Sequence, residues 1–125
     1  MTRYLDLDDV YRVIERFGFH IRDAGLLSSA LARPSASMFG VDAYALIDQK
    51  AAALLESLVR NHALVDGNKR TAWTAMVLFL WINGFQHDFE LDEAFELVVG
   101  VAEGRCEMTD TALSIRSHRV VRSGN

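Results

Sequence analysis

Apolar residues recur every three or four positions along most of this chain, a spacing that places them on one face of an α-helix. The first such stretch begins at the acidic residues of 6–9 and ends at Gly18. Its apolar face is formed by Val10, Val13, Ile14 and Phe17. A second, shorter helix is predicted from Ala24 to Ala32, because Pro34 disfavours continuing the helix.

The rest of the pattern is also mainly helical. Further helices are predicted at about 43–62, 68–83, 92–103 (interrupted by Gly100) and 109–119. Residues 33–42 contain many turn formers without a sustained period, so we expect an exposed flap or short hairpin there. Outside the flap, only Phe85–Phe89 has any strand character. The pattern therefore predicts an all-α helical bundle around a central buried helix at 68–83, in a single domain over residues 1–125.

Composition excludes several classes of protein. Half of the 125 residues are apolar, a quarter are charged, and there is one Pro, as in a compact helical protein. The net charge of −4 argues against direct nucleic-acid binding, which needs an excess of Lys and Arg on one face. A small basic cluster near the C-terminus is interpreted as a solvated final helix; it comprises Arg116, His118, Arg119 and Arg122.

Cysteine use and the N-terminal sequence indicate a cytoplasmic location. The single Cys106 has no partner for an intrachain disulfide, and residues 1–9 lack the apolar core of a signal peptide. The apolar run Ala72–Ile82 is shorter than the roughly 18 residues that a membrane-spanning helix needs. We therefore expect this run to be buried within the domain, with Trp73 and Trp81 in the core.

The ten residues from His62 to Thr71 concentrate polar chemistry more than any other part of the chain: His-Ala-Leu-Val-Asp-Gly-Asn-Lys-Arg-Thr. A histidine such as His62 accepts a hydroxyl proton near neutral pH, the task of a general base. Asp66 offers the hard oxygen ligand that Mg²⁺ prefers. Gly67 lets the backbone approach a ligand closely, and Asn68 is expected both to cap the next helix and to hydrogen-bond through its amide.

Two cations follow at an unfavourable place. Lys69 and Arg70 stand at the start of the 68–83 helix, where positive charge opposes the helix dipole. A bound polyphosphate would turn that repulsion into attraction, and free backbone N–H groups at a helix start also bind phosphate. Residues 62–71 thus contain the functional groups that phosphoryl or nucleotidyl transfer requires. His20, His87 and His118 have no such neighbours in sequence and are interpreted as surface or structural residues.

These ten residues resemble a known sequence signature. His62-x-x-x-Asp66-Gly67-Asn68-Lys69-Arg70 is similar to the motif of the Fic/Doc superfamily, and Lys69 followed by Thr71-Ala72 looks like its Doc (death-on-curing) branch. Other Doc-like stretches extend the resemblance over roughly residues 4–115; they are 23–27, 29–34 and 51–55.

The resemblance implies an all-helical fold that uses ATP with Mg²⁺. It implies that His62 is the catalytic base and Asp66 the metal ligand. It also implies that the turn and the helix start form the phosphate site, which consists of Gly67, Asn68, Lys69 and Arg70. It also implies a flap at about residues 35–44 that holds the target segment by strand addition. The residues at the centre of that flap are Met38, Phe39, Gly40 and Val41.

Two departures bear on which group is transferred. Fic enzymes that transfer AMP carry a second Gly where this chain has Lys69, and a second Arg where it has Trp73. The Doc branch shares both departures and resembles a protein kinase that phosphorylates elongation factor Tu and halts translation. We therefore favour phosphate transfer to a Ser or Thr hydroxyl over AMP transfer.

The Doc resemblance further implies a toxin controlled by a Phd-like antitoxin, whose disordered tail folds into an apolar groove. Two alternatives stay open: an AMP transferase of the Fic type, and an inactive nucleotide-binding partner with a regulatory role.

Overall fold

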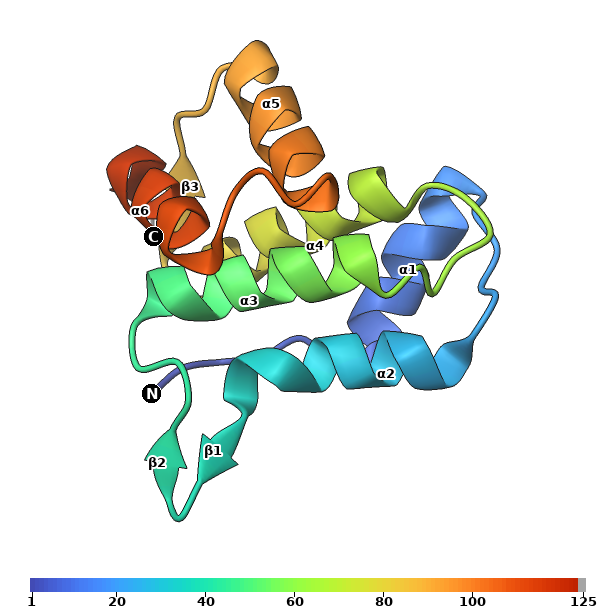
Figure 1. The fold of residues 1–125 in the computed structure, drawn as a ribbon, viewed down its shortest axis with the longest axis horizontal. Helices are drawn as coiled ribbons and strands as arrows, with labels where there is room; N and C mark the ends of the chain where they lie inside the picture. Colours follow the sequence, from blue (N-terminus) through green and yellow to red (C-terminus); the bar gives the residue numbers. More distant parts are fainter. Residues whose placement is uncertain (124–125) are drawn as a thin grey trace.

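A computed structural model describes residues Met1–Ser123, which form six α-helices, a short 3₁₀ helix and two small antiparallel sheets (Figure 1). The helices are α1 (Leu7–Phe17), α2 (Ala24–Ala32), α3 (Ile47–Arg60), α4 (Asn68–Ile82), α5 (Leu91–Ala102) and α6 (Met108–His118). The remaining elements are η1 (Arg33–Ser35), β1 (Ser37–Met38), β2 (Val41–Asp42), β3 (Phe85–His87) and β4 (Arg119–Val121). The all-α class expected from the sequence is confirmed. None of the helices in this part of the chain is long and apolar enough to cross a membrane.

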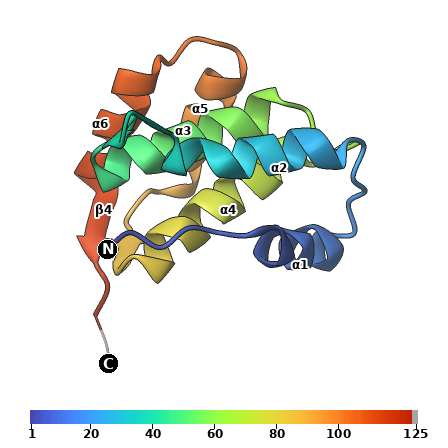
Figure 2. The same ribbon diagram turned by 90° about the horizontal axis from the view of Figure 1, so that it is seen from below.

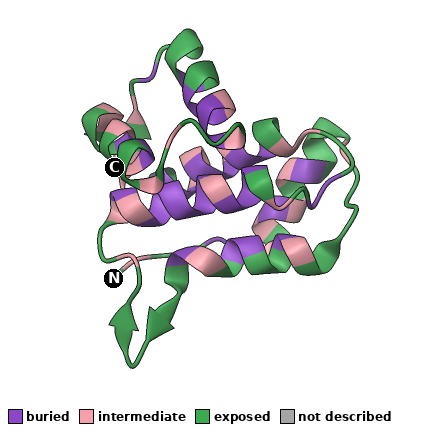
Figure 3. Cartoon of the chain, viewed as in Figure 1, coloured by how far each residue is buried: buried purple, intermediate pink, exposed green. Residues whose placement is uncertain are grey.

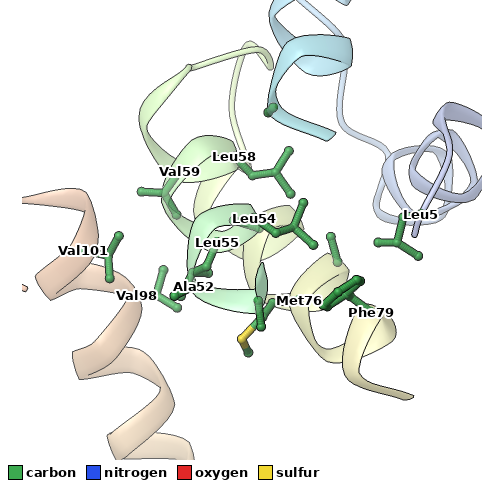
Figure 4. Packing of buried hydrophobic residues seen from close by; sticks show 14 of the residues in the cluster. Leu5, Ala52, Leu54, Leu55, Leu58, Val59, Met76, Phe79, Val98 and Val101 are labelled. Atoms are coloured by element: carbon green, nitrogen blue, oxygen red, sulfur yellow. The ribbon is translucent and has the colours of Figure 1, made fainter. Parts of the chain in front are cut away.

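The core forms where α3 packs against α4, with α1 on the other side of α4 (Figure 2). Figure 4 shows Leu54, Leu55 and Leu58 of α3 close to Met76 and Phe79 of α4, and all five are almost fully buried. Most residues of α3 are buried, but fewer than half of those of α4 (Figure 3). The most buried helix is therefore α3, and not the 68–83 helix expected from its apolar run.

Trp81 is the clearest departure from the expected core. It lies near the C-terminal end of α4 with 42% of its surface exposed, although the sequence placed it in the core. The Arg122 guanidinium lies over its ring at 4.6 Å, so a cation covers part of this aromatic surface. Trp73 is half-buried. The rings of Phe89 and His87 pack edge-on against it, with distances between ring centroids of 5.3 Å and 5.4 Å. Apolar residues therefore lie on more sides of α4 than the side that packs into the core.

The predicted flap is a hairpin. β1 pairs with β2, and the two turn residues both have positive φ angles, 53° at Phe39 and 78° at Gly40. The side chains at its tip are exposed, Phe39 by 98%. Its base is tied to α3 by the buried Lys50, whose Nζ donates to Asp42 Oδ2 at 3.3 Å.

The helix after the flap begins four residues later than the expected Ala43. α3 starts at Ile47 because Leu46 keeps an extended conformation, and the Leu46 N–H donates to the Gln49 side chain at 3.1 Å. Leu46 therefore precedes the helix and is 51% exposed.

The C-terminal part of the chain corrects two further expectations. Gly100 does not interrupt α5, because the helix continues through it and the following chain folds back onto it. A Cβ at position 100 would lie 2.7 Å from Cys106 Sγ, so only glycine fits this contact. The basic end of the chain does not remain helical, because Arg119 begins β4, which pairs with β3. The Arg119 guanidinium forms an ion pair with the buried Asp48.

Candidate active site

Residues 62–71 span the end of the loop between α3 and α4 and the first turn of α4. α3 ends at Arg60, two residues before His62, which was expected to lie within that helix. His62 has a φ of 51°, a left-handed conformation that is uncommon for residues with a side chain. Its side chain is exposed. The backbone therefore turns sharply at the residue proposed as the base.

Gly67, and not Asn68, caps α4. Its carbonyl accepts the Thr71 N–H at 2.9 Å, and Asn68 is the first helical residue. The Asn68 amide instead accepts the Leu64 N–H at 3.0 Å and donates to the Leu64 carbonyl at 3.1 Å. The capping role expected of Asn68 is thus wrong, because its side chain closes the loop; its contact with phosphate stays a prediction.

Gly67 is also required by its neighbour Phe19. Its φ is 77°, and a Cβ placed on it would lie 2.2 Å from Cε2 of the Phe19 ring. The aromatic ring therefore lies directly against the glycine backbone. This contact holds the start of α4 in place and forms one wall of the cavity described next.

All six residues expected at the site line one cavity of about 630 Å³. They are His62, Asp66, Gly67, Asn68, Lys69 and Arg70, joined by Phe19, Val59, Ala102 and Glu103. The cavity thus combines an exposed imidazole, an exposed carboxylate and the N-terminus of a 15-residue helix. Its volume is in the range of sites for small ligands and cofactors.

The charges at this helix start are available for an anion. Lys69 and Arg70 are exposed, and no carboxylate within residues 1–123 forms an ion pair with either. The first turn of α4 contains no acidic residue. The first backbone N–H groups of the helix add positive potential at the same place.

Asp66 fits a magnesium ion that arrives with a nucleotide. In the described part of the chain, no three His, Cys, Asp or Glu side chains gather as a metal-binding group. Mg²⁺ usually keeps several waters and is held by one or two carboxylates together with substrate phosphates. The cavity presents two exposed carboxylates, Asp66 and Glu103, and Asp66 together with phosphates held by Lys69 and Arg70 would meet that requirement.

The flap residues are not part of this cavity. The hairpin precedes α3 and His62 follows it, so the two lie at opposite ends of a 14-residue helix (Figure 1). At 1.5 Å per residue that helix is about 20 Å long. The target-holding role of Met38, Phe39, Gly40 and Val41 stays a prediction, and a segment that touched both places would have to extend along the molecule.

A second hollow lies beside the site. This groove of about 390 Å³ lies between α1, α4 and α5, and its wall is mainly apolar. Leu91 and Phe95 of α5 are exposed by 85% and 64%. Lys69 and Arg70 line both the groove and the cavity, so the two hollows share a wall.

Sequence reasoning missed two contacts of the site. Phe19 and Arg22 lie in the connection between α1 and α2, and both reach the α3–α4 loop. Their segment has no helical or strand period, and the Doc-like stretch begins only at Asp23. No local signal in the sequence pointed to them.

Comparison with known proteins gives a consistent family assignment. The family model described as the Fic/DOC family matches residues 4–80. The chain is 52% identical over 120 residues to the protein named toxin Doc of Mycolicibacterium smegmatis (strain ATCC 700084 / mc(2)155), with 92% of each chain covered. It is also 38% identical over 66 residues to the protein kinase doc of Escherichia phage P1, covering 53% of this chain and 52% of that protein. The chain therefore belongs to the Fic/DOC family, and within it to the Doc branch.

Proposed function

We propose that this protein is the toxin of a toxin–antitoxin pair and acts as a protein-modifying transferase, moving the γ-phosphate of ATP to a Ser or Thr hydroxyl of elongation factor Tu. The carrying observation is the single cavity that gathers His62, Asp66, Lys69 and Arg70 at the N-terminus of α4. The names of the two relatives, a toxin Doc and a protein kinase doc, support the same class of activity.

Each group in the cavity has a task in this reaction. His62 accepts the proton of the attacking hydroxyl, because its imidazole is exposed to the cavity. The N–H groups of α4, with Lys69 and Arg70, bind the phosphates and stabilise the charge that develops during transfer. Asp66 would hold Mg²⁺, which would neutralise phosphate charge, and ADP leaves as the γ-phosphate passes to the hydroxyl.

The two departures from AMP-transferring Fic enzymes have structural counterparts that favour phosphate transfer. Lys69 places a long cationic side chain at the cavity wall, where a second glycine would leave space. Trp73 packs against His87 and Phe89, so it offers no charge to a phosphate. We infer a nucleotide orientation that brings the γ-phosphate, and not the α-phosphate, towards His62.

Labelled ATP tests the group that is moved. Incubating the protein with purified elongation factor Tu and ATP labelled at the γ-phosphate should label the factor, whereas ATP labelled at the α-phosphate should not. Mass spectrometry of the modified factor should give an increase of one phosphate. Label from the α-phosphate on the factor would replace the kinase assignment by AMP transfer.

For the antitoxin, we propose that a Phd-like partner inserts an apolar segment into the groove between α1, α4 and α5. Leu91 and Phe95 are more exposed than large apolar side chains usually are in a helix with a covered face. Lys69 and Arg70 at the groove edge favour a segment that also carries carboxylates. A segment in this position contacts the two cations that the reaction needs.

A charge introduced into the groove should break this binding. Phe95→Glu should stop a co-expressed Phd-like antitoxin from neutralising growth arrest, and should weaken binding in calorimetry by about 30-fold or more, as expected for a central aromatic anchor. Leu113→Glu is the matched control, because Leu113 is exposed by 57% on α6, outside the groove. Equal neutralisation of Phe95→Glu and the parent protein would rule the groove out.

A further inference from the structure

The connection between α1 and α2 lies along the loop that contains His62 (Figure 1). The N–H groups of Arg22 and Asp23 donate to the Ala63 carbonyl at 2.7 Å and 3.0 Å, and the Val65 N–H donates to the His20 carbonyl at 2.9 Å. Between these contacts, Ile21 and Leu64 form an isolated antiparallel bridge. Residues 20–23, here called the bracing segment, therefore act as a short strand beside residues 62–65.

The side chain of Arg22 adds a contact of a different kind. Its guanidinium donates to the His62 carbonyl from Nε at 2.9 Å and also from Nη2. Two donors from one rigid planar group fix the direction of that carbonyl more firmly than a single hydrogen bond does. Both residues are exposed, so water would satisfy the carbonyl if Arg22 were absent. The contact is therefore not needed to satisfy a buried polar group.

The His62 carbonyl belongs to a residue in an unfavourable conformation. A left-handed φ for a non-glycine residue is unfavourable and persists only where surrounding contacts hold it. Rotating the backbone at His62 moves Cβ and the imidazole together. The guanidinium thus acts on the torsions that decide where the imidazole points.

We propose that Arg22 is a positioning residue that fixes the His62 backbone and so aims the imidazole into the cavity. The proposal rests on the proposed function of His62 as general base. Arg22 does not line the cavity and does not touch the reacting atoms. Small misplacement of a catalytic group costs up to about 10²-fold in rate, so its removal should lower kcat more than it alters binding.

Kinetics of Arg22 variants test this role. Arg22→Ala should lower kcat for phosphate transfer to elongation factor Tu by about 10- to 10²-fold with little change in the KM for ATP. Arg22→Lys keeps the charge but loses the two-donor fork, so it should restore only part of the rate. Arg116→Ala removes an exposed arginine from α6 and should behave like the parent protein.

Other roles of Arg22 give different results. A purely electrostatic role would raise the KM for ATP, leave kcat unchanged and be fully rescued by Arg22→Lys; that result would overturn the proposal. A role in folding alone would lower the unfolding temperature and leave kcat of the folded fraction intact, which would also overturn it. In a His62→Ala background, Arg22→Ala should cause no further loss of rate, because the two residues act through one step.

A structural measurement separates this proposal from the proposed function. If the parent protein transfers no phosphate, the base assignment fails, but NMR of the folded protein still reports on His62. Arg22→Ala should shift or broaden the His62 imidazole and backbone signals and leave those of His118, on α6, in place. Unchanged His62 signals would overturn the positioning role whatever the activity.

Discussion

Replacing His62 by Ala should lower phosphate transfer by about 10²- to 10⁴-fold, the usual contribution of a general base. The side chain is exposed and its carbonyl keeps the contact with Arg22, so the fold should be unaffected. The proposed phosphate-binding groups are Gly67 and the start of α4, so the KM for ATP should change little. Single-turnover kinetics with γ-labelled ATP measure the loss, and circular dichroism confirms that the variant is folded.

The same variant separates the enzyme from an inactive binding partner. If the protein arrests growth by modifying its target, expression of His62→Ala should leave growth unaffected. Growth arrest that persists in the variant would favour regulation by binding alone, and an unchanged rate of transfer would refute the base assignment.

Replacing Gly67 by Ala should damage both stability and activity. The left-handed φ of 77° costs a side chain roughly 1–2 kcal/mol. A Cβ at 2.2 Å from Phe19 also forces that ring to move, and such overpacking costs about 1–3 kcal/mol. Together these effects should lower the free energy of unfolding by about 2–5 kcal/mol. Displacing Phe19 changes the cavity wall, so the rate of phosphate transfer should fall as well.

Gly18 provides a matched control for this prediction. It has the same φ of 77°, but a Cβ there would meet nothing within 4 Å beyond its own chain neighbours, so Gly18→Ala measures mainly the backbone cost. Urea unfolding of Gly67→Ala, Phe19→Ala and the double variant should show that removing the ring recovers part of the loss. Equal destabilisation by Gly18→Ala and Gly67→Ala would show that the Phe19 contact is unimportant.

Periodicity predicted the helices well because each buries one regular face, and the ends of α1 and α2 agree with the structure. It failed at β4, where a distant segment decides the local structure: this strand exists because residues 85–87 offer a pairing edge. That partner is not visible in a short window of sequence. At Gly100 the error was local, because a glycine packed closely against Cys106 does not break the helix.

In the candidate site, too, local features could be predicted from the sequence and long-range contacts could not. The motif residues are contiguous, so their assembly around the start of α4 could be predicted from spacing. The left-handed turn at His62 and the segment that braces it could not, because they depend on a contact across 40 positions of the chain. The loop role of Asn68 was also missed, since an amide suits a cap and a loop closure equally well.

Lys69 and Arg70 line both the cavity and the groove, so the proposed nucleotide and antitoxin sites would be thermodynamically linked. A carboxylate-bearing ligand in the groove would partly neutralise these cations and weaken their attraction for phosphate. Because linkage is reciprocal, a nucleotide in the cavity would weaken binding in the groove by the same factor. The cellular ATP concentration would then set how much antitoxin is needed to silence the protein.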